Sequence, residues 1–256
     1  MTYAVFLLTF VVPPMLVLAA VTARRRRGAV SQRELWAWIA GLAVVAVVYT
    51  TPWDNYLVAS GTWDYDPDLV LGITLGWVPL EEYCFFVLQT VMTGLWVGLL
   101  LPREPAGGIG GVGWRAAAAA AATLLAASAT FFALIVWGSE GMRYLSLIVS
   151  WAALPLALQA GFGLDLLAAR WRTVALGAGV PTLWLSAADT LAIREGTWHI
   201  AEKTSTGVKL PGGLPVEELV FFLVTNLLVT CGLVLGTSPE GKARARAWLR
   251  WLRGQR

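Results

Sequence analysis

The chain has little charge, only one histidine and only two cysteines, and each shortage excludes a class of protein. Of its 256 residues, 14% are charged and 57% are hydrophobic, which is too apolar for an ordinary soluble domain. Cys84 stands near the start of one predicted helix and Cys231 deep within another, and no residues stand at metal-ligand spacing, so neither a disulfide nor a metal site is predicted. The composition instead indicates a protein whose solvent is the lipid bilayer.

Hydrophobic runs of bilayer-spanning length set the predicted fold. A transmembrane helix needs about 20 mainly apolar residues, and the sequence contains seven runs that can serve. We place them at residues 2–21, 35–51, 78–101, 116–137, 144–164, 173–193 and 215–236. The predicted fold class is therefore an all-α integral membrane protein with seven transmembrane helices.

The distribution of Lys and Arg predicts the orientation of these helices. No basic region precedes the first apolar run and the basic cluster 24–27 follows it, which is the reverse of a cleavable signal peptide. With the N-terminus outside, all Lys and Arg residues except Arg143, Arg194, Lys203 and Lys209 fall on the cytoplasmic side. The positive-inside rule favours this topology in the cell membrane, with the C-terminus in the cytoplasm. Because membrane insertion accounts for the basic residues, nucleic-acid binding is not predicted.

The second half of the sequence repeats the first. At one constant separation, Asp54, Gly61, Thr62 and Trp63 match Asp189, Gly196, Thr197 and Trp198. After one inserted residue the match resumes, and the segment PLEEYCFF at 79–86 pairs with PVEELVFF at 215–222. Matches this extensive indicate an internal duplication.

The repeat divides the chain into two three-helix units. Residues 1–101 form the first unit and residues 144–236 the second, with a linker loop and helix at 102–143 and a basic cytoplasmic tail at 237–256. Since three is odd, direct fusion would invert the second unit, and the fourth helix, which begins with the alanine run 116–122, restores its orientation. We therefore predict two parallel three-helix repeats joined by a linker helix, with both motifs on the outer face. The tail either lies along the inner leaflet or is a solvated end.

The glycine-rich segment 108–113 formally fits the dinucleotide-binding pattern G-x-G-x-x-G. No strand is predicted before it, no acidic residue follows at the expected distance, and an apolar alanine run comes next. We predict a flexible cytoplasmic loop here and no bound cofactor.

Two adjacent glutamates stand at the beginning of the third and of the seventh predicted helices. They are Glu81 and Glu82 in the first motif and Glu217 and Glu218 in the second. Proline and carboxylates are favourable in the first turn of any helix, so one copy alone would need no function. Carboxyl groups at membrane depth are costly, however, and here the pair occurs twice. The duplication favours a functional site.

Aromatic rings accompany these acids at helical spacing. Phe85 and Phe86 stand four residues after the first pair, and Phe221 and Phe222 after the second, so each carboxyl shares a helix face with a ring. Two carboxyl groups crowded against apolar walls tend to share a proton, although the helix dipole favours the anion. Aromatic faces would stabilise a developing cation. The combination favours acid-initiated carbocation chemistry on an alkene.

Two aspartates and two tryptophans also match across the repeat. Asp54 and Asp189 are candidates to support the glutamates by hydrogen bonding, and the alternative is a helix-end residue that faces headgroups or water. Trp63 and Trp198 are candidates to line the site, and the alternative is an anchor at the membrane interface. His199 would titrate near neutrality if exposed, but its repeat counterpart is an aspartate, so a catalytic role is not favoured.

The duplicated motif resembles that of the small membrane-embedded lycopene cyclases of actinobacteria, archaea and related bacteria. In that family each half carries Pro-x-Glu-Glu/Asp-x-x-Phe-Phe, as residues 79–86 and 215–222 do here, and the halves occur as two subunits or as one fused chain. The resemblance covers nearly the whole chain. It implies a flavin-independent lycopene β-cyclase that needs no cofactor, because the reaction is a redox-neutral isomerisation.

The resemblance also implies a reaction. Lycopene enters from the bilayer, a glutamic acid protonates C2, the C5=C6 bond attacks the cation at C1, and loss of the C6 proton gives a β-ring. One cyclised end gives γ-carotene and two give β-carotene. Carried over by position, Glu81 and Glu217 are the first choices for acid and base, with Glu82 and Glu218 as close alternates. Membrane lipids and other enzymes of the carotenoid pathway are the further partners implied.

Other interpretations fit parts of the pattern. A transporter with two parallel three-helix repeats has the same architecture, but its polar site would lie near the membrane midplane, whereas the duplicated acids lie near one surface. A retinal pigment is excluded because the last span, 215–236, has no lysine. A membrane scaffold without activity is a third interpretation. Within the cyclase interpretation, a β or ε ring and a C40 or C50 substrate both stay open.

Overall fold

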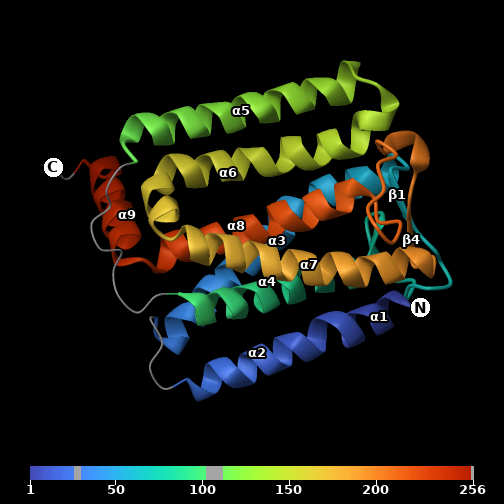
Figure 1. Ribbon diagram of the computed structural model, residues 1–256, viewed down its shortest axis with the longest axis horizontal. Coiled ribbons are helices and arrows are strands. Elements are labelled where there is room, and N and C mark those ends of the chain that lie inside the picture. Colours follow the sequence, from blue (N-terminus) through green and yellow to red (C-terminus); the bar gives the residue numbers. More distant parts are fainter. Residues whose placement is uncertain (26–29, 102–111, 255–256) are drawn as a thin grey trace.

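The computed structural model describes residues 1–25, 30–101 and 112–254. Parts of the predicted basic cluster and most of the predicted glycine-rich loop lie outside the described residues. The helices are α1 (Tyr3–Phe6), α2 (Val12–Arg24), α3 (Gln32–Ala59), α4 (Leu80–Leu100), α5 (Trp114–Trp137), α6 (Arg143–Ala169), α7 (Trp171–Arg194), α8 (Val216–Thr237) and α9 (Pro239–Leu252), as Figure 1 shows. A short π-helical stretch, Leu7–Val11, joins α1 to α2.

In the described part of the chain, seven helices are long and apolar enough to cross a membrane, as the sequence predicted. They are Tyr3–Arg24, Gln32–Ala59, Leu80–Leu100, Trp114–Trp137, Glu140–Ala169, Trp171–Arg194 and Val216–Thr237. The prediction placed the end of the second span at residue 51, where a proline interrupts the apolar run. In the structure α3 continues through Pro52 to Ala59, so Asp54 lies inside the helix and not at its end.

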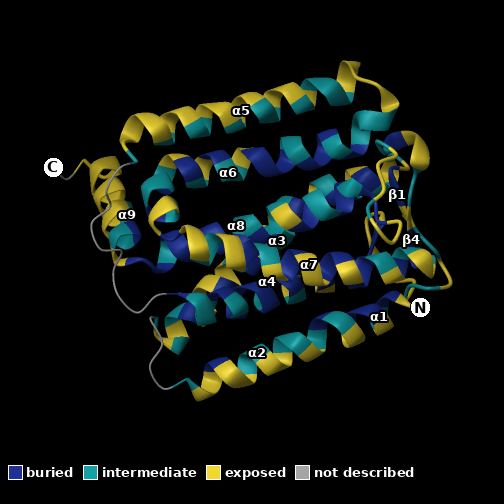
Figure 2. Ribbon diagram, viewed as in Figure 1, coloured by how far each residue is buried: buried dark blue, intermediate teal, exposed yellow. Residues whose placement is uncertain are grey.

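The spans differ strongly in how far they are buried. In α4, 56% of the most apolar stretch is buried inside the protein, whereas none of that stretch in α5 is buried. Figure 2 shows α5 as a helix with mainly exposed and half-buried residues that packs along α6 at one side of the bundle. The motif helices α4 and α8 pack against each other, so the two acidic helix starts belong to the bundle interior.

The described residues form four short strands, and β1 (Trp63–Tyr65) and β4 (Trp198–Ile200) lie at the end of the bundle that carries the N-terminus, opposite α9 (Figure 1). Strand β1 pairs antiparallel with β4, and β2 (Thr74–Leu75) pairs with β3 (Val78–Pro79). The prediction of an all-α protein missed these strands. The β1–β4 pair joins the two halves of the sequence outside the helical bundle.

A buried polar cluster holds three of the helices together. Asn226 on α8 accepts hydrogen bonds from Gln89 (3.2 Å) and from Thr93 (2.7 Å) on α4. Its amide donates to Thr182 on α7 over 3.2 Å. In an apolar interior such bonds stabilise helix association, because no water is present as an alternative hydrogen-bond partner.

We expect Asn226→Ala to lower the free energy of unfolding by about 1–3 kcal/mol, because it leaves the Thr93 hydroxyl without its acceptor and leaves the Gln89 amide with Thr225 as its one remaining acceptor among the described residues. Thermal unfolding of the detergent-solubilised protein measures this. Thr230→Val on the same helix is the matched control, since the Thr230 hydroxyl is buried without a partner in the described part of the chain. Equal losses of stability in both variants would contradict a specific role of the cluster.

Candidate active site

All four motif glutamates are buried, and they divide into two pairs by what they contact. Glu82 and Glu218, here called the inner glutamates, lie in the interior at the starts of α4 and α8. Glu81 and Glu217, the outer glutamates, bind the loops that precede these helices. Neighbouring residues on a helix point about 100° apart, which explains how one motif supplies both kinds.

The outer glutamates accept hydrogen bonds from loop residues. The backbone N–H of Leu71 donates to Glu81 Oε1 over 2.5 Å. At the matching repeat position, the backbone N–H of Thr206 donates to Glu217 Oε1 over 2.6 Å, and the hydroxyls of Thr206 and Ser205 add bonds of 2.8 and 3.1 Å. The outer glutamates therefore tie each loop to the start of its helix.

The inner glutamates accept hydrogen bonds from tyrosines. Tyr3 and Tyr65 donate to Glu82 Oε2 over 2.5 and 3.0 Å. Tyr144 donates to Glu218 Oε1 over 2.5 Å. No donor among the described residues reaches the second oxygen of either carboxyl, Glu82 Oε1 or Glu218 Oε2, so each keeps one oxygen available for other chemistry.

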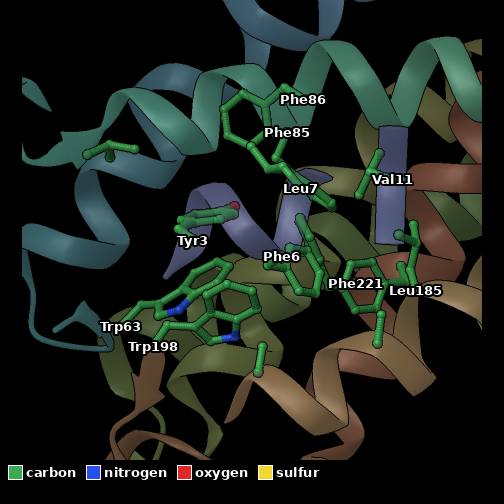
Figure 3. Close-up of a cluster of buried hydrophobic side chains, with 14 of the residues drawn as sticks. Tyr3, Phe6, Leu7, Val11, Trp63, Phe85, Phe86, Leu185, Trp198 and Phe221 are labelled. Atoms are coloured by element: carbon green, nitrogen blue, oxygen red, sulfur yellow. The ribbon is translucent and has the colours of Figure 1, made fainter. Parts of the chain in front are cut away.

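Both inner glutamates line one small cavity of about 10 Å³. Its remaining walls are Asp189 and seven aromatic rings: Tyr3, Phe6, Trp63, Phe85, Trp198, Phe221 and Phe222. These rings come from α1, α4, α8 and the two paired strands β1 and β4, and Figure 3 labels all of them except Phe222. The site thus brings acids and ring faces from both halves of the chain together, and all of the predicted lining residues except Phe86 border this cavity.

Phe86 lines a second, larger cavity of about 110 Å³ between α3, α4, α6 and α8. Its walls are mostly apolar, and Tyr49, Trp151 and Leu228 are among them. Phe221 lines both cavities, so its ring separates the inner glutamates from this apolar space.

The two predicted supporting aspartates are both buried, so neither faces headgroups or water. Asp189 lines the cavity, and the Trp198 indole donates to its Oδ1 over 2.9 Å. At the matching position, neither carboxyl oxygen of Asp54 has a hydrogen-bond partner in the described part of the chain, and nor has the Trp63 indole. No hydrogen bond between these aspartates and the motif glutamates is present among the described residues, so their supporting role stays a prediction.

The three tyrosines were not predicted from the sequence. Tyr3 and Tyr144 each stand at the start of the first long helix of a half, which is a signal that an alignment of the first helices would have found. Tyr65 lies in β1, outside the spans, and the repeat places Ile200 at its matching position. Burial, and after it the Glu82 carboxylate, raise the pKa of the Tyr65 phenol well above its usual value. Tyr65 therefore keeps its proton and remains a donor.

His199 does not belong to the site. Its side chain is exposed on β4, and Nδ1 lies 3.9 Å from Asp64 Oδ1 across the strand pair. Within the described ranges, no group of three or more His, Cys, Asp and Glu side chains is arranged to hold a metal ion.

Comparison with known proteins adds a family to this geometry. The family model described as lycopene cyclase matches residues 1–100 and 141–234. The chain belongs to the lycopene cyclase family. Each matched stretch contains one glutamate pair, and the unmatched stretch between them contains α5. The resemblance indicated by the duplicated motif is confirmed.

Individual members of the lycopene cyclase family are similar over most of the chain. The lycopene beta-cyclase of Halobacterium salinarum is 42% identical over 234 residues, which cover 91% of this chain and 95% of that protein. The bifunctional lycopene cyclase/phytoene synthase of Gibberella fujikuroi is 38% identical over 257 residues, or 95% of this chain and 43% of that longer protein. No solved structure matches.

Proposed function

We propose that this protein is a lycopene β-cyclase that closes the ends of lycopene into β-rings at the inner glutamates. One observation carries the proposal: a buried carboxyl from each half, each bonded by a tyrosine hydroxyl, lines a single cavity walled by aromatic rings. Membership of the lycopene cyclase family supports it. γ-Carotene would be the product of one ring closure and β-carotene the product of two.

The proposed chemistry needs a proton donor, a cation-stabilising wall and a proton acceptor. One inner glutamic acid protonates C2 of the terminal double bond, which leaves a cation at C1. The C5=C6 electron pair then forms the C1–C6 bond, and the other inner glutamate removes the C6 proton. Faces of Phe85, Phe221 and Phe222 stabilise the cation without acting as bases.

We prefer the inner glutamates to the outer ones, which reverses the order suggested by the motif alone. Glu81 and Glu217 each have an oxygen engaged by loop donors, and neither borders the aromatic cavity. Glu82 and Glu218 both border it, and this position distinguishes them, since every one of the four glutamates has one oxygen without a donor in the described structure. A proton donor has to lie within hydrogen-bond reach of the atom that it protonates.

The substrate path follows from the larger cavity. Lycopene is an apolar polyene that dissolves in the bilayer, and we propose that it enters through the space between α3 and α6. The Phe221 ring then has to move before an end of the polyene reaches the inner glutamates. Membrane lipids are thus the medium of delivery, and other enzymes of the carotenoid pathway are the proposed source of the substrate.

We propose further that the halves are two parallel repeats in the cell membrane, with the strand pairs outside and α9 in the cytoplasm. Matching donors at Leu71 and Thr206 support this arrangement. In the β1–β4 pair Asp64 lies opposite His199, its counterpart in the repeat, so the register has local two-fold symmetry. The distribution of Lys and Arg supports the orientation.

Expression in a bacterium that accumulates lycopene tests the function. We expect conversion of lycopene to γ-carotene and β-carotene, separated by chromatography and identified by absorbance and mass. Lycopene that stays acyclic while the protein is present in the membrane would contradict the proposal. An ε-ring product would keep the cyclase function and contradict the assigned site of proton loss.

A further inference from the structure

The two inner glutamates have different numbers of hydrogen-bond donors, although other positions of the two halves match. Tyr3 and Tyr144 donate to Glu82 and Glu218 at the same distance, 2.5 Å. Among the described residues, a further donor reaches Glu82 alone: Tyr65, at 3.0 Å. The residue that matches Tyr65 in the second half is Ile200, which has no polar side-chain atom.

This difference favours a negative charge on Glu82. Hydrogen bonds to a carboxylate stabilise its charged form, and two phenols stabilise it more than one. The Tyr3 ring is part of the cavity wall, so this donor also keeps water from Glu82 while it holds the charge. Glu218, with one donor, retains a proton more readily.

The aspartates also differ between the halves. Asp189 lines the same cavity as Glu218, and its Oδ1 accepts a hydrogen bond from the Trp198 indole. Asp54 has no equivalent donor in the described structure, because the bond to the Trp63 indole is not formed. The remaining motif acids, Glu81 and Glu217, have one and three loop donors respectively, but neither borders the cavity, so this difference does not act on the reacting end of a substrate there.

We propose that Glu218 delivers the proton to the substrate and that Glu82, held by Tyr3 and Tyr65, receives the proton at the end of the reaction. Tyr65 is thus a positioning residue that makes two similar halves perform different steps. This division of labour rests on the proposed cyclase function.

The steps balance without any further reactant. The Glu218 O–H bond breaks and its proton bonds to C2, so Glu218 becomes a carboxylate while the cation forms at C1. After the C1–C6 bond forms, the cation is at C5, and a Glu82 oxygen takes the C6 proton while the C–H electron pair becomes the C5=C6 bond. The proton then returns from Glu82 to Glu218, and Asp189, in the same cavity, is the carboxyl available to relay it.

Deuterium exchange separates the two roles. Membranes containing the full chain are incubated with lycopene in D2O, and the readout is the deuterium at C2 of recovered lycopene divided by the β-rings formed. If proton loss to Glu82 is slowed, the cation more often loses a proton from C2 and returns to lycopene, which then carries deuterium. Tyr65→Phe should therefore raise this ratio about 10-fold, which is the effect of one hydrogen bond to a charged group. Tyr144→Phe is the matched control and should not raise it.

The glutamate variants give the limiting cases. Glu82→Gln should yield deuterated lycopene and few rings, whereas Glu218→Gln should yield neither. The proposal is overturned if Glu218→Gln exchanges deuterium into lycopene and Glu82→Gln does not, or if both variants or neither variant does so. It is also overturned if Tyr65→Phe slows exchange and ring formation equally, so that their ratio is unchanged. If the wild-type chain forms no rings, the proposed function itself fails, so the two failures are distinguishable.

Discussion

Replacing either inner glutamate by glutamine is expected to lower the rate of ring formation by about 100-fold or more, because a positioned acid or base contributes about 10²–10⁴-fold. Glutamine has nearly the same shape as glutamic acid but cannot deliver a proton to an alkene. It would still accept the hydrogen bonds from Tyr3 or Tyr144, so the fold should be kept. The measurement is the initial rate of β-ring formation per amount of protein in isolated membranes.

The outer glutamates supply the control. Glu81→Gln and Glu217→Gln retain an amide oxygen that can accept from the loop N–H groups of Leu71 and Thr206. We expect each to lower the rate by about 10-fold at most, as the weakening of one charged hydrogen bond would. If these variants are folded and as inactive as the inner ones, the outer glutamates are the reacting groups.

Phe221→Ala is expected to lower the free energy of unfolding by about 3–5 kcal/mol, the usual cost of deleting a buried ring. Phe221 is 2% exposed, and its ring centroid lies 5.8 Å from that of Trp53 and 5.5 Å from that of Phe222. Deletion would join the two cavities that this ring separates. Unfolding of the detergent-solubilised protein, followed by tryptophan fluorescence, measures the loss.

Two further variants separate packing from chemistry. Phe132→Ala removes a ring that is 64% exposed on α5 and should change stability little. Phe221→Leu keeps an apolar side chain and loses only the ring face, which is worth about 2 kcal/mol toward a desolvated cation, or about 30-fold in rate. A rate within twofold of wild type in Phe221→Leu would show that the ring only fills space.

The helices of this fold could be predicted from apolar run length, but several boundaries could not. The apolar run of the second span ends before Pro52, because a proline, a tryptophan and an aspartate follow one another there. The helix continues because the surrounding bundle accepts these groups: the Trp53 indole donates to the Leu147 carbonyl over 3.0 Å. The strands β1 and β4 are only three residues long, and each is stabilised by a partner far away in the sequence. Local patterns carry no such information.

The candidate site was predictable in composition but not in detail. Duplication singled out the glutamates and the rings, because a repeated acidic pair is unusual at the start of a membrane helix. It could not separate Glu82 from Glu81, since both are first-turn residues and both are buried, one against the bundle and one against a loop. Tyr65 escaped notice for a related reason. Its contact with Glu82 depends on how the loop folds back, and no residue in the other half repeats it.

The small size of the cavity between the inner glutamates has a consequence for how the reaction ends. A carbocation that meets water is captured as an alcohol, whereas one that meets only a carboxylate loses a proton and becomes an alkene. The cavity measures about 10 Å³, close to the least space that holds one water molecule, and most of its wall is aromatic. On the proposed mechanism, an end of the polyene fills this space and leaves no room for water beside the inner glutamates. We therefore expect proton loss in place of hydration, with a hydrocarbon as the product.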